Sequence, residues 1–339
     1  MIVSFIIPTF NSRSYIARCL DSVFSLGYGS DDFEVIIIDD ASTDDTVDIV
    51  RRYAINHRCL RLVCSSENHR QGAARNLGLS IAQGDCVVFL DSDDEVDAGI
   101  KDAITRNSDE GLDMVAMRVV QITIEGEIED LAQLPYKEDQ IFSGVDLQTD
   151  FPFWHTASNG YVYNRSFLNK VNYRFAEEVI YEDSDFVSVH LYYAKKMAYC
   201  DSCCYRHHIN ATSTTHTFST QHLADYAYLG ARMLGFYEAL PNKATKYADS
   251  ILDGGWFCIS ESFRRLWRLG SGDEVRTFYT RLDSYCSRTQ LLALKKARKY
   301  WRLWTGFCLR HRDMTVIIMG LASPVFKRMY DWWKRFSLK

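Results

Sequence analysis

The chain has 339 residues, of which 47% are hydrophobic and 24% are charged, so it can bury one large core or two smaller ones. With only 5 prolines and 18 glycines, and without a repeat of fixed period, the sequence excludes a disordered, collagen-like, solenoid or propeller protein. The net charge of −5 is uneven: residues 290–339 carry +10 and residues 1–289 carry −15. This asymmetry predicts an anionic partner for the C-terminal segment.

The first ninety residues alternate short apolar runs with amphipathic stretches. Four mostly apolar runs of four or five residues are typical of strands that are covered on both faces: residues 3–7, 35–38, 60–64 and 87–90. Apolar residues at helical spacing predict helices over 15–24 and 74–81, and Ser42 with Asp45 resembles a capping box that opens another. This order predicts an α/β fold with a mainly parallel sheet flanked by helices.

After residue 94 the pattern becomes looser. We expect a strand over 114–124, then a polar, acidic loop over 125–140. From residue 221 onward apolar stripes at helical spacing predict an almost wholly helical region. The predicted domains are therefore residues 1–217 and a helical C-terminal region, residues 218–339.

The N-terminal residues MIVSFIIP have neither a basic region nor a long apolar core, so they do not resemble a signal peptide, and we expect a cytoplasmic protein. The ten cysteines are then expected to be reduced. Cys200, Cys203 and Cys204, with two histidines close by, could form half of a zinc site, but the sequence shows no second half.

Acidic residues follow the expected strands. In an open parallel sheet, ligands bind beyond the carboxyl ends of the strands, where this sequence places Thr9, Asp40 and the group Asp91 to Asp94. Each could by itself be a turn or cap residue. Three carboxylates within four residues repel one another unless a cation compensates, and oxygen ligands of this kind suit Mg²⁺ or Mn²⁺. Because such ions often also bind substrate phosphates, the sequence indicates a nucleotide-linked substrate.

Four ordered motifs then resemble those of the family 2 glycosyltransferases, which have the GT-A fold. The motifs are SFIIPTFN, EVIIIDDASTDDT, ENHRQGAARNLGLSIAQGDCVVFLDSDD and YEDSDF, and the resemblance covers about residues 1–215. It implies inverting transfer of a sugar from a nucleoside diphosphate donor, with a UDP-sugar favoured, and a divalent metal at a DxD motif. A glycan or lipid-linked glycan is the implied acceptor, as in bacterial surface-polysaccharide biosynthesis.

The resemblance also assigns roles to single residues. Thr9 and Asp40 are expected beside the donor base and ribose, and Arg75 beside the nucleotide. Asp91 and Asp93 are the two acids of DxD, with Asp93 expected on the metal and Asp91 near the ribose or the metal; Asp94 is a possible extra ligand.

The motif YEDSDF contains the expected base. The family assigns this role to the second acid, which is Asp183 here, and Glu182 is a weaker candidate for acceptor contact. An inverting displacement needs one carboxylate to deprotonate the acceptor hydroxyl and needs no protein nucleophile. The alternative is that both acids simply begin a helix on the surface.

Two further segments are assigned with alternatives. Relatives often show Tyr-Arg-x-Arg after the base, whereas this chain has Arg206 and then His208, which could contact the donor phosphates or a metal. Trp154 lies in an aromatic stretch that either stacks on an acceptor sugar or packs in the core.

The basic segment 290–339 contains four of the seven tryptophans. Residues 314–326 are too short to span a bilayer, which needs about 20 apolar residues. We expect this segment to lie on an anionic membrane surface, on the inner face of the plasma membrane; alternatively it completes the helical core.

Two other classes of function compete with the glycosyltransferase. A binding protein of the same fold would retain the donor site without activity. A haloacid-dehalogenase-like phosphatase would use Asp91 as its nucleophile, but Glu95 stands where that family has Thr or Val. Nucleic-acid binding is not expected.

Overall fold

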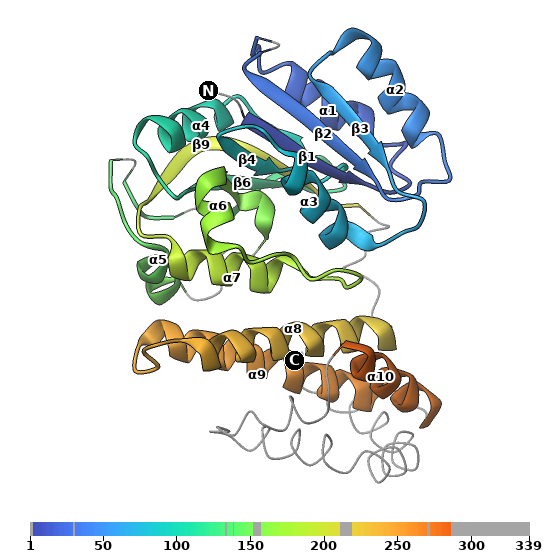
Figure 1. Cartoon of the computed structure of the whole chain (residues 1–339), viewed down its shortest axis with the longest axis vertical. Helices are drawn as coiled ribbons and strands as arrows, with labels where there is room; N and C mark the ends of the chain where they lie inside the picture. Colours follow the sequence, from blue (N-terminus) through green and yellow to red (C-terminus); the bar gives the residue numbers. More distant parts are fainter. Residues whose placement is uncertain are drawn as a thin grey trace. The chain divides into compact units, whose positions relative to one another are not determined.

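The computed structural model describes residues 3–29, 31–132, 134–137, 139–151, 157–210, 219–269 and 272–285. The chain divides into two compact units, Met1–Ser213 and Thr214–Lys339. The first is an α/β unit and the second is helical in its described part (Figure 1). The fold class expected from the sequence is confirmed.

The α/β unit contains one nine-stranded sheet, in the order β3-β2-β1-β4-β8-β6-β9-β5, with β7 beside β6. The strands are β1 (Val3–Thr9), β2 (Phe33–Asp39), β3 (Leu60–Cys64), β4 (Cys86–Phe89), β5 (Glu95–Val96), β6 (Met114–Ile122), β7 (Ile128–Ala132), β8 (Tyr161–Asn164) and β9 (Met197–His208). The first four strands along the chain, β1 to β4, pair with one another in parallel, as expected. Beyond β4 the sheet is mixed, because β8 runs antiparallel to both β4 and β6 while β6 and β9 are parallel.

Helices cover both faces of this sheet. The helices of the unit are α1 (Ile16–Phe24), α2 (Thr46–Asn56), α3 (Arg70–Ile81), α4 (Ile100–Asp109), α5 (Gly144–Asp150), α6 (Arg165–Val171) and α7 (Asp183–Tyr193), with the short 3-10 helix η1 (Ser158–Gly160). One apolar core joins α1, α2 and α4 to the sheet, and the other joins α3, α5, α6 and α7 to its opposite face. β1, β2 and β4 are buried along their whole length, which explains their mostly apolar sequences.

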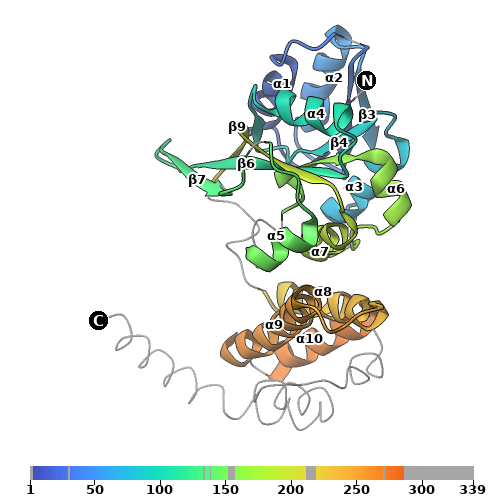
Figure 2. The ribbon, with the colours of Figure 1, turned by 90° about the vertical axis from the view of Figure 1, so that its left-hand side faces the viewer.

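Two local expectations differ from the structure. The acidic segment expected to be a loop contains β7, which pairs with β6 as a hairpin that projects from the unit in Figure 2. The capping box is wrong: α2 begins at Thr46, where Asp44 accepts a hydrogen bond from the backbone, while the Ser42 hydroxyl accepts one from Asn11 N–H. Ser42 therefore connects two loops at the strand ends instead of capping a helix.

The second unit contains three described helices, α8 (Thr220–Ala239), α9 (Lys246–Leu269) and α10 (Gly272–Tyr285). The helical prediction for this region is confirmed in its described residues, 219–269 and 272–285. A buried carboxylate, Asp225 of α8, accepts hydrogen bonds from Arg281 at 2.8 Å and from the Tyr285 hydroxyl at 2.7 Å, both on α10. This pairing supplies the charge compensation that a buried carboxylate needs.

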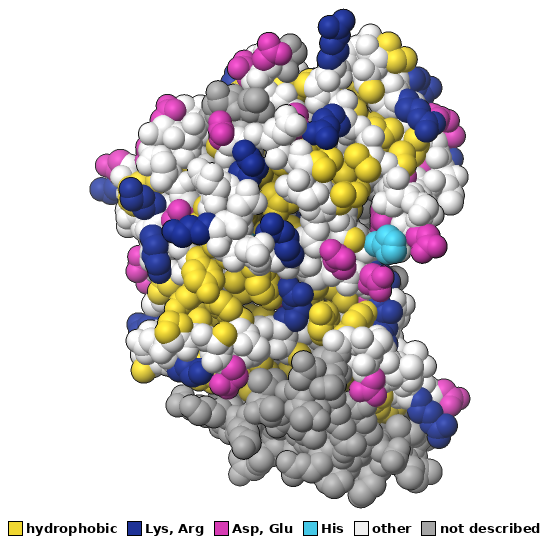
Figure 3. Space-filling model, viewed as in Figure 1, with side chains coloured by type: hydrophobic (Ala, Val, Ile, Leu, Met, Phe, Trp, Pro, Cys, Tyr) yellow, Lys and Arg dark blue, Asp and Glu magenta, His cyan; other side chains and the backbone are white. Residues whose placement is uncertain are grey.

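Within the described ranges, no helix has the length and apolar character needed to cross a membrane. Figure 3 shows acidic and basic side chains interspersed over the visible face of the α/β unit. The strongly basic segment, residues 290–339, lies outside the described residues.

Candidate active site

The carboxyl ends of β1 and β2 bring the first expected site residues together. Thr9 and Asp39 are register partners, and the Thr9 hydroxyl lies 3.2 Å from an oxygen of Asp39. The next residue, Asp40, is 4% exposed. Its two carboxylate oxygens accept hydrogen bonds from the backbone N–H groups of His69 at 2.9 Å and Arg70 at 2.6 Å. Asp40 thus fastens the start of α3 to the end of β2.

Arg75 of α3 connects two parts of the site that are far apart in sequence. Its guanidinium donates to Asp91, which follows β4, at 2.6 Å, and also to Glu182, which precedes α7. Arg75 is 2% exposed. Burial by itself would lower the pKa of Arg75. The negative charges of Asp91 and Glu182 have the larger combined effect and raise the pKa above its ordinary value, so the guanidinium remains a cation.

Two adjacent residues of η1 extend the same connection. The backbone N–H of Ser158 donates to Asp183 at 3.3 Å, and the side-chain amide of Asn159 donates to Asp91 at 3.2 Å. Both residues are buried. A dipeptide that showed no pattern in the sequence therefore contacts both the expected base and the first acid of DxD.

Asp183, the expected base, is the first residue of α7 and is partly buried. Burial raises the pKa of Asp183 and of Glu182, and the Arg75 guanidinium opposes both shifts. Partial desolvation of this kind makes a carboxylate a better proton acceptor than it is in water.

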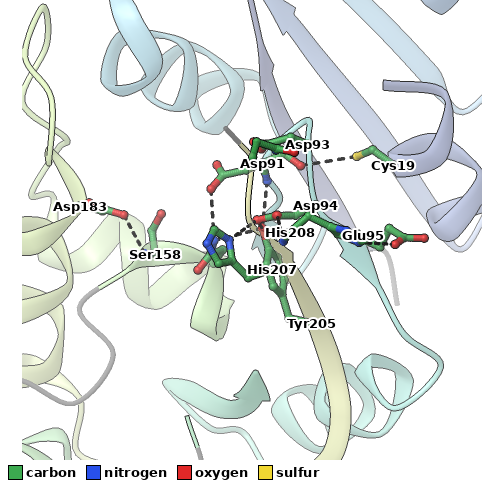
Figure 4. A network of polar contacts seen from close by, with 12 residues as sticks. Cys19, Asp91, Asp93, Asp94, Glu95, Ser158, Asp183, Tyr205, His207 and His208 are labelled. Atoms are coloured by element: carbon green, nitrogen blue, oxygen red, sulfur yellow. Dashed lines mark hydrogen bonds and ion pairs between the residues drawn. The ribbon is translucent and has the colours of Figure 1, made fainter. Parts of the chain in front are cut away.

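The acids after β4 form a network with β9 (Figure 4). The hydroxyl of Tyr205, a fully buried residue, donates to Asp94 at 2.7 Å and accepts from the backbone N–H of Asp91 at 3.2 Å and from Asn159 at 3.0 Å. Nδ1 of His207 lies 3.2 Å from Asp94, and this hydrogen bond raises the pKa of His207. Figure 4 shows Asp183 beside Ser158, on the other side of the acids from Glu95.

Strand alternation places Arg206 and His208 differently from what the sequence suggested. Arg206 forms an ion pair with Asp97, and Nε2 of His208 contacts Glu95, whereas Tyr205 and His207 reach Asp94. Side chains at successive strand positions point to opposite faces. Of the two histidines, His207 is therefore the one whose side chain contacts Asp94, while the His208 backbone N–H also donates to Asp94 at 2.8 Å.

Asp93 is the acid expected to bind metal. One of its oxygens accepts from the Asn210 amide at 2.8 Å. Burial, together with the charges of Asp94 and Asp91, raises the pKa of Asp93 to about 6. Within the described part of the chain, no cluster of three or more His, Cys, Asp or Glu side chains is placed to hold a metal ion.

Other expected residues have different placements. Glu182 is 4% exposed and forms an ion pair with Arg75, so its charge compensates that of the buried guanidinium. Arg75, expected beside the nucleotide, forms ion pairs with Asp91 and Glu182. Trp154 lies outside the described residues. Cys200 and Cys204 are both buried, and their sulfur atoms lie 3.7 Å apart.

The comparisons with known proteins agree with this geometry. Residues 4–171 match the family model described as glycosyl transferase family 2. The chain belongs to glycosyltransferase family 2. Because the chain belongs to this family, we no longer interpret Asp91 as the nucleophile of a phosphatase.

Three relatives of this family 2 glycosyltransferase have names that state an activity or a biosynthetic pathway. It is 39% identical over 103 residues to the poly(ribitol-phosphate) beta-N-acetylglucosaminyltransferase TarS of Staphylococcus aureus. This match covers 30% of this chain and 18% of TarS. It is 27% identical over 331 residues to the succinoglycan biosynthesis protein ExoO of Rhizobium meliloti, covering 93% of this chain and 84% of ExoO. A match to the poly(ribitol-phosphate) beta-glucosyltransferase of Bacillus spizizenii, 36% identical, covers 28% of this chain and 15% of that protein. The chain thus spans under a fifth of the length of two of these relatives.

The fold is also shared with solved structures. The crystal structure of S. aureus TarS 1–349 in complex with UDP-GlcNAc has a TM-score of 0.64 and 20% sequence identity, and the match covers 96% of this chain and 93% of that one. This family 2 enzyme therefore has the GT-A fold.

Proposed function

We propose that the enzyme transfers a sugar from a UDP-sugar to a glycan or lipid-linked glycan, with inversion, in polysaccharide biosynthesis. One observation carries the proposal: Arg75 contacts both Asp91, at the expected donor site, and Glu182, the neighbour of the expected base. The acids expected for donor binding and for proton transfer therefore belong to one connected site. The relatives named for polysaccharide biosynthesis, and the UDP-GlcNAc bound to a protein of the same fold, support the substrate classes.

In this proposal Asp183 accepts the proton of the acceptor hydroxyl. The acceptor oxygen then bonds to the anomeric carbon while the bond from that carbon to the diphosphate oxygen breaks, so that configuration inverts and UDP departs. The Ser158 N–H orients one oxygen of Asp183. Arg75 fixes Asp91 and Glu182, and its charge limits the repulsion among the surrounding carboxylates.

A divalent ion, Mn²⁺ or Mg²⁺, is the proposed cofactor, and Asp93 is its proposed ligand, with Asp91 the second candidate. Burial is the main cause of the raised pKa of Asp93, and the nearby carboxylates of Asp94 and Asp91 raise it further; a cation bound here would offset their negative charge. One or two carboxylates suffice, because Mg²⁺ usually completes its shell with water and substrate phosphates. When bound, the ion supplies positive charge to the departing diphosphate.

A donor screen tests the proposed function. The purified full chain would be incubated with UDP-glucose, UDP-galactose, UDP-GlcNAc, UDP-GalNAc, GDP-mannose and dTDP-rhamnose, with Mn²⁺ or with EDTA, and released nucleoside diphosphate measured. We expect UDP release from at least one UDP-sugar with Mn²⁺ and a large decrease with EDTA. Binding of UDP-sugars without release, with every acceptor glycan tried, would instead support the non-catalytic binding protein.

Membrane association is proposed for residues 290–339 on sequence grounds. These residues carry a net charge of +10, and basic residues near an anionic leaflet contribute about 1 kcal/mol each. Co-sedimentation of the full chain with anionic and neutral liposomes, at low and high salt, tests this. Equal partitioning with a chain ending at Gln290 would contradict it.

A further inference from the structure

The loop between α6 and α7 leads directly to the expected base and has an unusual backbone. Three of its residues that are not glycine have positive φ: Asn172 at 52°, Glu178 at 60° and Tyr181 at 65°. Side chains disfavour this left-handed region, and such residues persist only where surrounding contacts hold them. Tyr181 immediately precedes Glu182 and Asp183, so whatever holds this loop also determines where the two acids lie.

The side chain of Asn76, on α3, holds the middle of the loop. Its amide nitrogen donates to the backbone oxygen of Phe175 at 3.1 Å, and its amide oxygen accepts from the backbone N–H of Phe175 at 3.1 Å. The amide nitrogen also contacts Glu177 at 2.8 Å. Both hydrogen-bonding groups of one loop residue are thus satisfied by one side chain, in the manner of a strand neighbour.

Phe175 connects this clamp to both halves of the site. Its ring stacks on Phe186 of α7, with ring centroids 3.7 Å apart and planes inclined by 9°. Its ring also meets Phe89, the last residue of β4, edge to face at 5.1 Å. Phe186 lies three residues after Asp183, and Phe89 lies two residues before Asp91. A displacement of Phe175 would therefore change the position of the base helix relative to the DxD strand.

The contact between α3 and the loop leaves no spare room. A Cβ atom on Gly72, one turn before Asn76, would lie 2.0 Å from the backbone oxygen of Ala176. Gly72, Arg75 and Asn76 have the i, i+3, i+4 spacing of one helix face. This face of α3 therefore meets the loop at three successive points: at Ala176, at Glu182 and at Phe175.

We propose that Asn76 is a positioning residue that sets the location of Asp183 relative to Asp91 by clamping the backbone of Phe175. The catalytic part of this inference rests on the proposed function. Asn76 hydrogen-bonds to the loop through Phe175 and Glu177, so its effect on the reaction passes through the loop. Loss of the clamp should slow the chemical step while leaving UDP binding intact.

The test compares Asn76→Ala with two matched controls. Asn107→Ala removes another side-chain clamp in the same unit, because Asn107 is fully buried and donates to the backbone oxygen of Leu112 at 3.2 Å, away from the site. Glu177→Ala removes only the third contact of Asn76. For each full-length variant, kcat with the donor found in the screen, the Kd of UDP with Mn²⁺, and amide hydrogen exchange over residues 174–183 would be measured.

We expect Asn76→Ala to lower kcat by about 10- to 100-fold, the scale of an ångström-sized misplacement of a catalytic group. The Kd of UDP should stay within about twofold, and exchange over 174–183 should become faster. Both controls should keep a kcat near that of the wild type. If Asn76→Ala does not fold, Asn76→Ser, whose shorter hydroxyl cannot bond both backbone groups of Phe175, is measured in its place and should show a loss of the same kind.

Three results would overturn the inference: unchanged exchange over 174–183, an unchanged kcat despite faster exchange, or an equal loss of kcat in Glu177→Ala or Asn107→Ala. Failure of the proposed function is a different result, in which the wild-type protein turns over no donor. In that event the exchange measurement still decides whether Asn76 holds the loop, because it requires no substrate.

Discussion

Removal of the Tyr205 hydroxyl should destabilise the α/β unit strongly, because three groups depend on it. Tyr205→Phe keeps the ring but removes one hydrogen-bond donor of the Asp94 carboxylate, at 2.7 Å, and the acceptor of the Asp91 N–H, at 3.2 Å. Asn159 also loses a contact but retains Asp91. A hydrogen bond to a charged group contributes about 1.5 to 3 kcal/mol, and an unsatisfied buried donor costs about 1 to 3 kcal/mol. The expected loss is about 3 to 4 kcal/mol.

A matched variant separates this network from the general effect of a lost hydroxyl. Tyr163 is also fully buried, but its hydroxyl makes one hydrogen bond, to the Ser158 backbone oxygen at 3.1 Å. Tyr163→Phe should therefore cost about 1 kcal/mol.

Calorimetry measures both variants without substrate. For a unit of this size, 1 kcal/mol corresponds to about 2 to 4 °C in Tm, so Tyr205→Phe should unfold about 6 to 16 °C below the wild type. Equal Tm values for the two phenylalanine variants would refute the view that Tyr205 holds the acids after β4.

Three further predictions concern single side chains. Asp93→Ala should weaken UDP binding with Mn²⁺ at least about tenfold by titration calorimetry, because the diphosphate charge is less compensated; unchanged affinity would exclude Asp93 as the metal ligand. Asp183→Asn should lower kcat at least about a hundredfold without changing UDP affinity, since an amide cannot accept the proton, and turnover within a few-fold of wild type would exclude it as the base. Burial lowers the pKa of His190 to about 4. The free energy of unfolding therefore has its full value above pH 6.5, and it decreases by up to about 3 kcal/mol as the pH falls toward 4. Urea unfolding of His190→Leu should therefore depend less on pH in this range than that of the wild type, and identical dependence would contradict the assignment.

The first half of the sheet was predictable because its strands are buried on both faces. β1, β2 and β4 are mostly apolar, and the position of Asp91 follows from the end of β4. β9 has no such pattern, since its sequence MAYCDSCCYRHH mixes apolar, aromatic, cysteine and polar residues without a regular period. Which of Arg206, His207 and His208 reaches the acids depends on the face of that strand, and a motif compared letter by letter does not contain this information.

The contacts of η1 and of the loop before α7 were not predictable for another reason. Ser158 and Asn159 carry no periodicity, and their importance comes from partners that are 25 and 68 residues away in the chain. The sequence predicts Arg75 as a site residue, beside the nucleotide. Its burial between two carboxylates depends on the packing of α3 against both β4 and the start of α7, which a linear pattern does not specify.

The ion pairs of Arg75 also constrain how the polypeptide can acquire its structure during synthesis. Arg75 and Asp91 leave the ribosome long before Glu182, which lies 107 residues after Arg75. Until Glu182 arrives, the guanidinium lacks one of the two carboxylates that compensate its burial. β5 must wait as well, because it joins the sheet beside β9. A nascent chain ending at residue 171, the last residue of the segment matched to the family, would thus contain the DxD acids yet be unable to complete the structure around them.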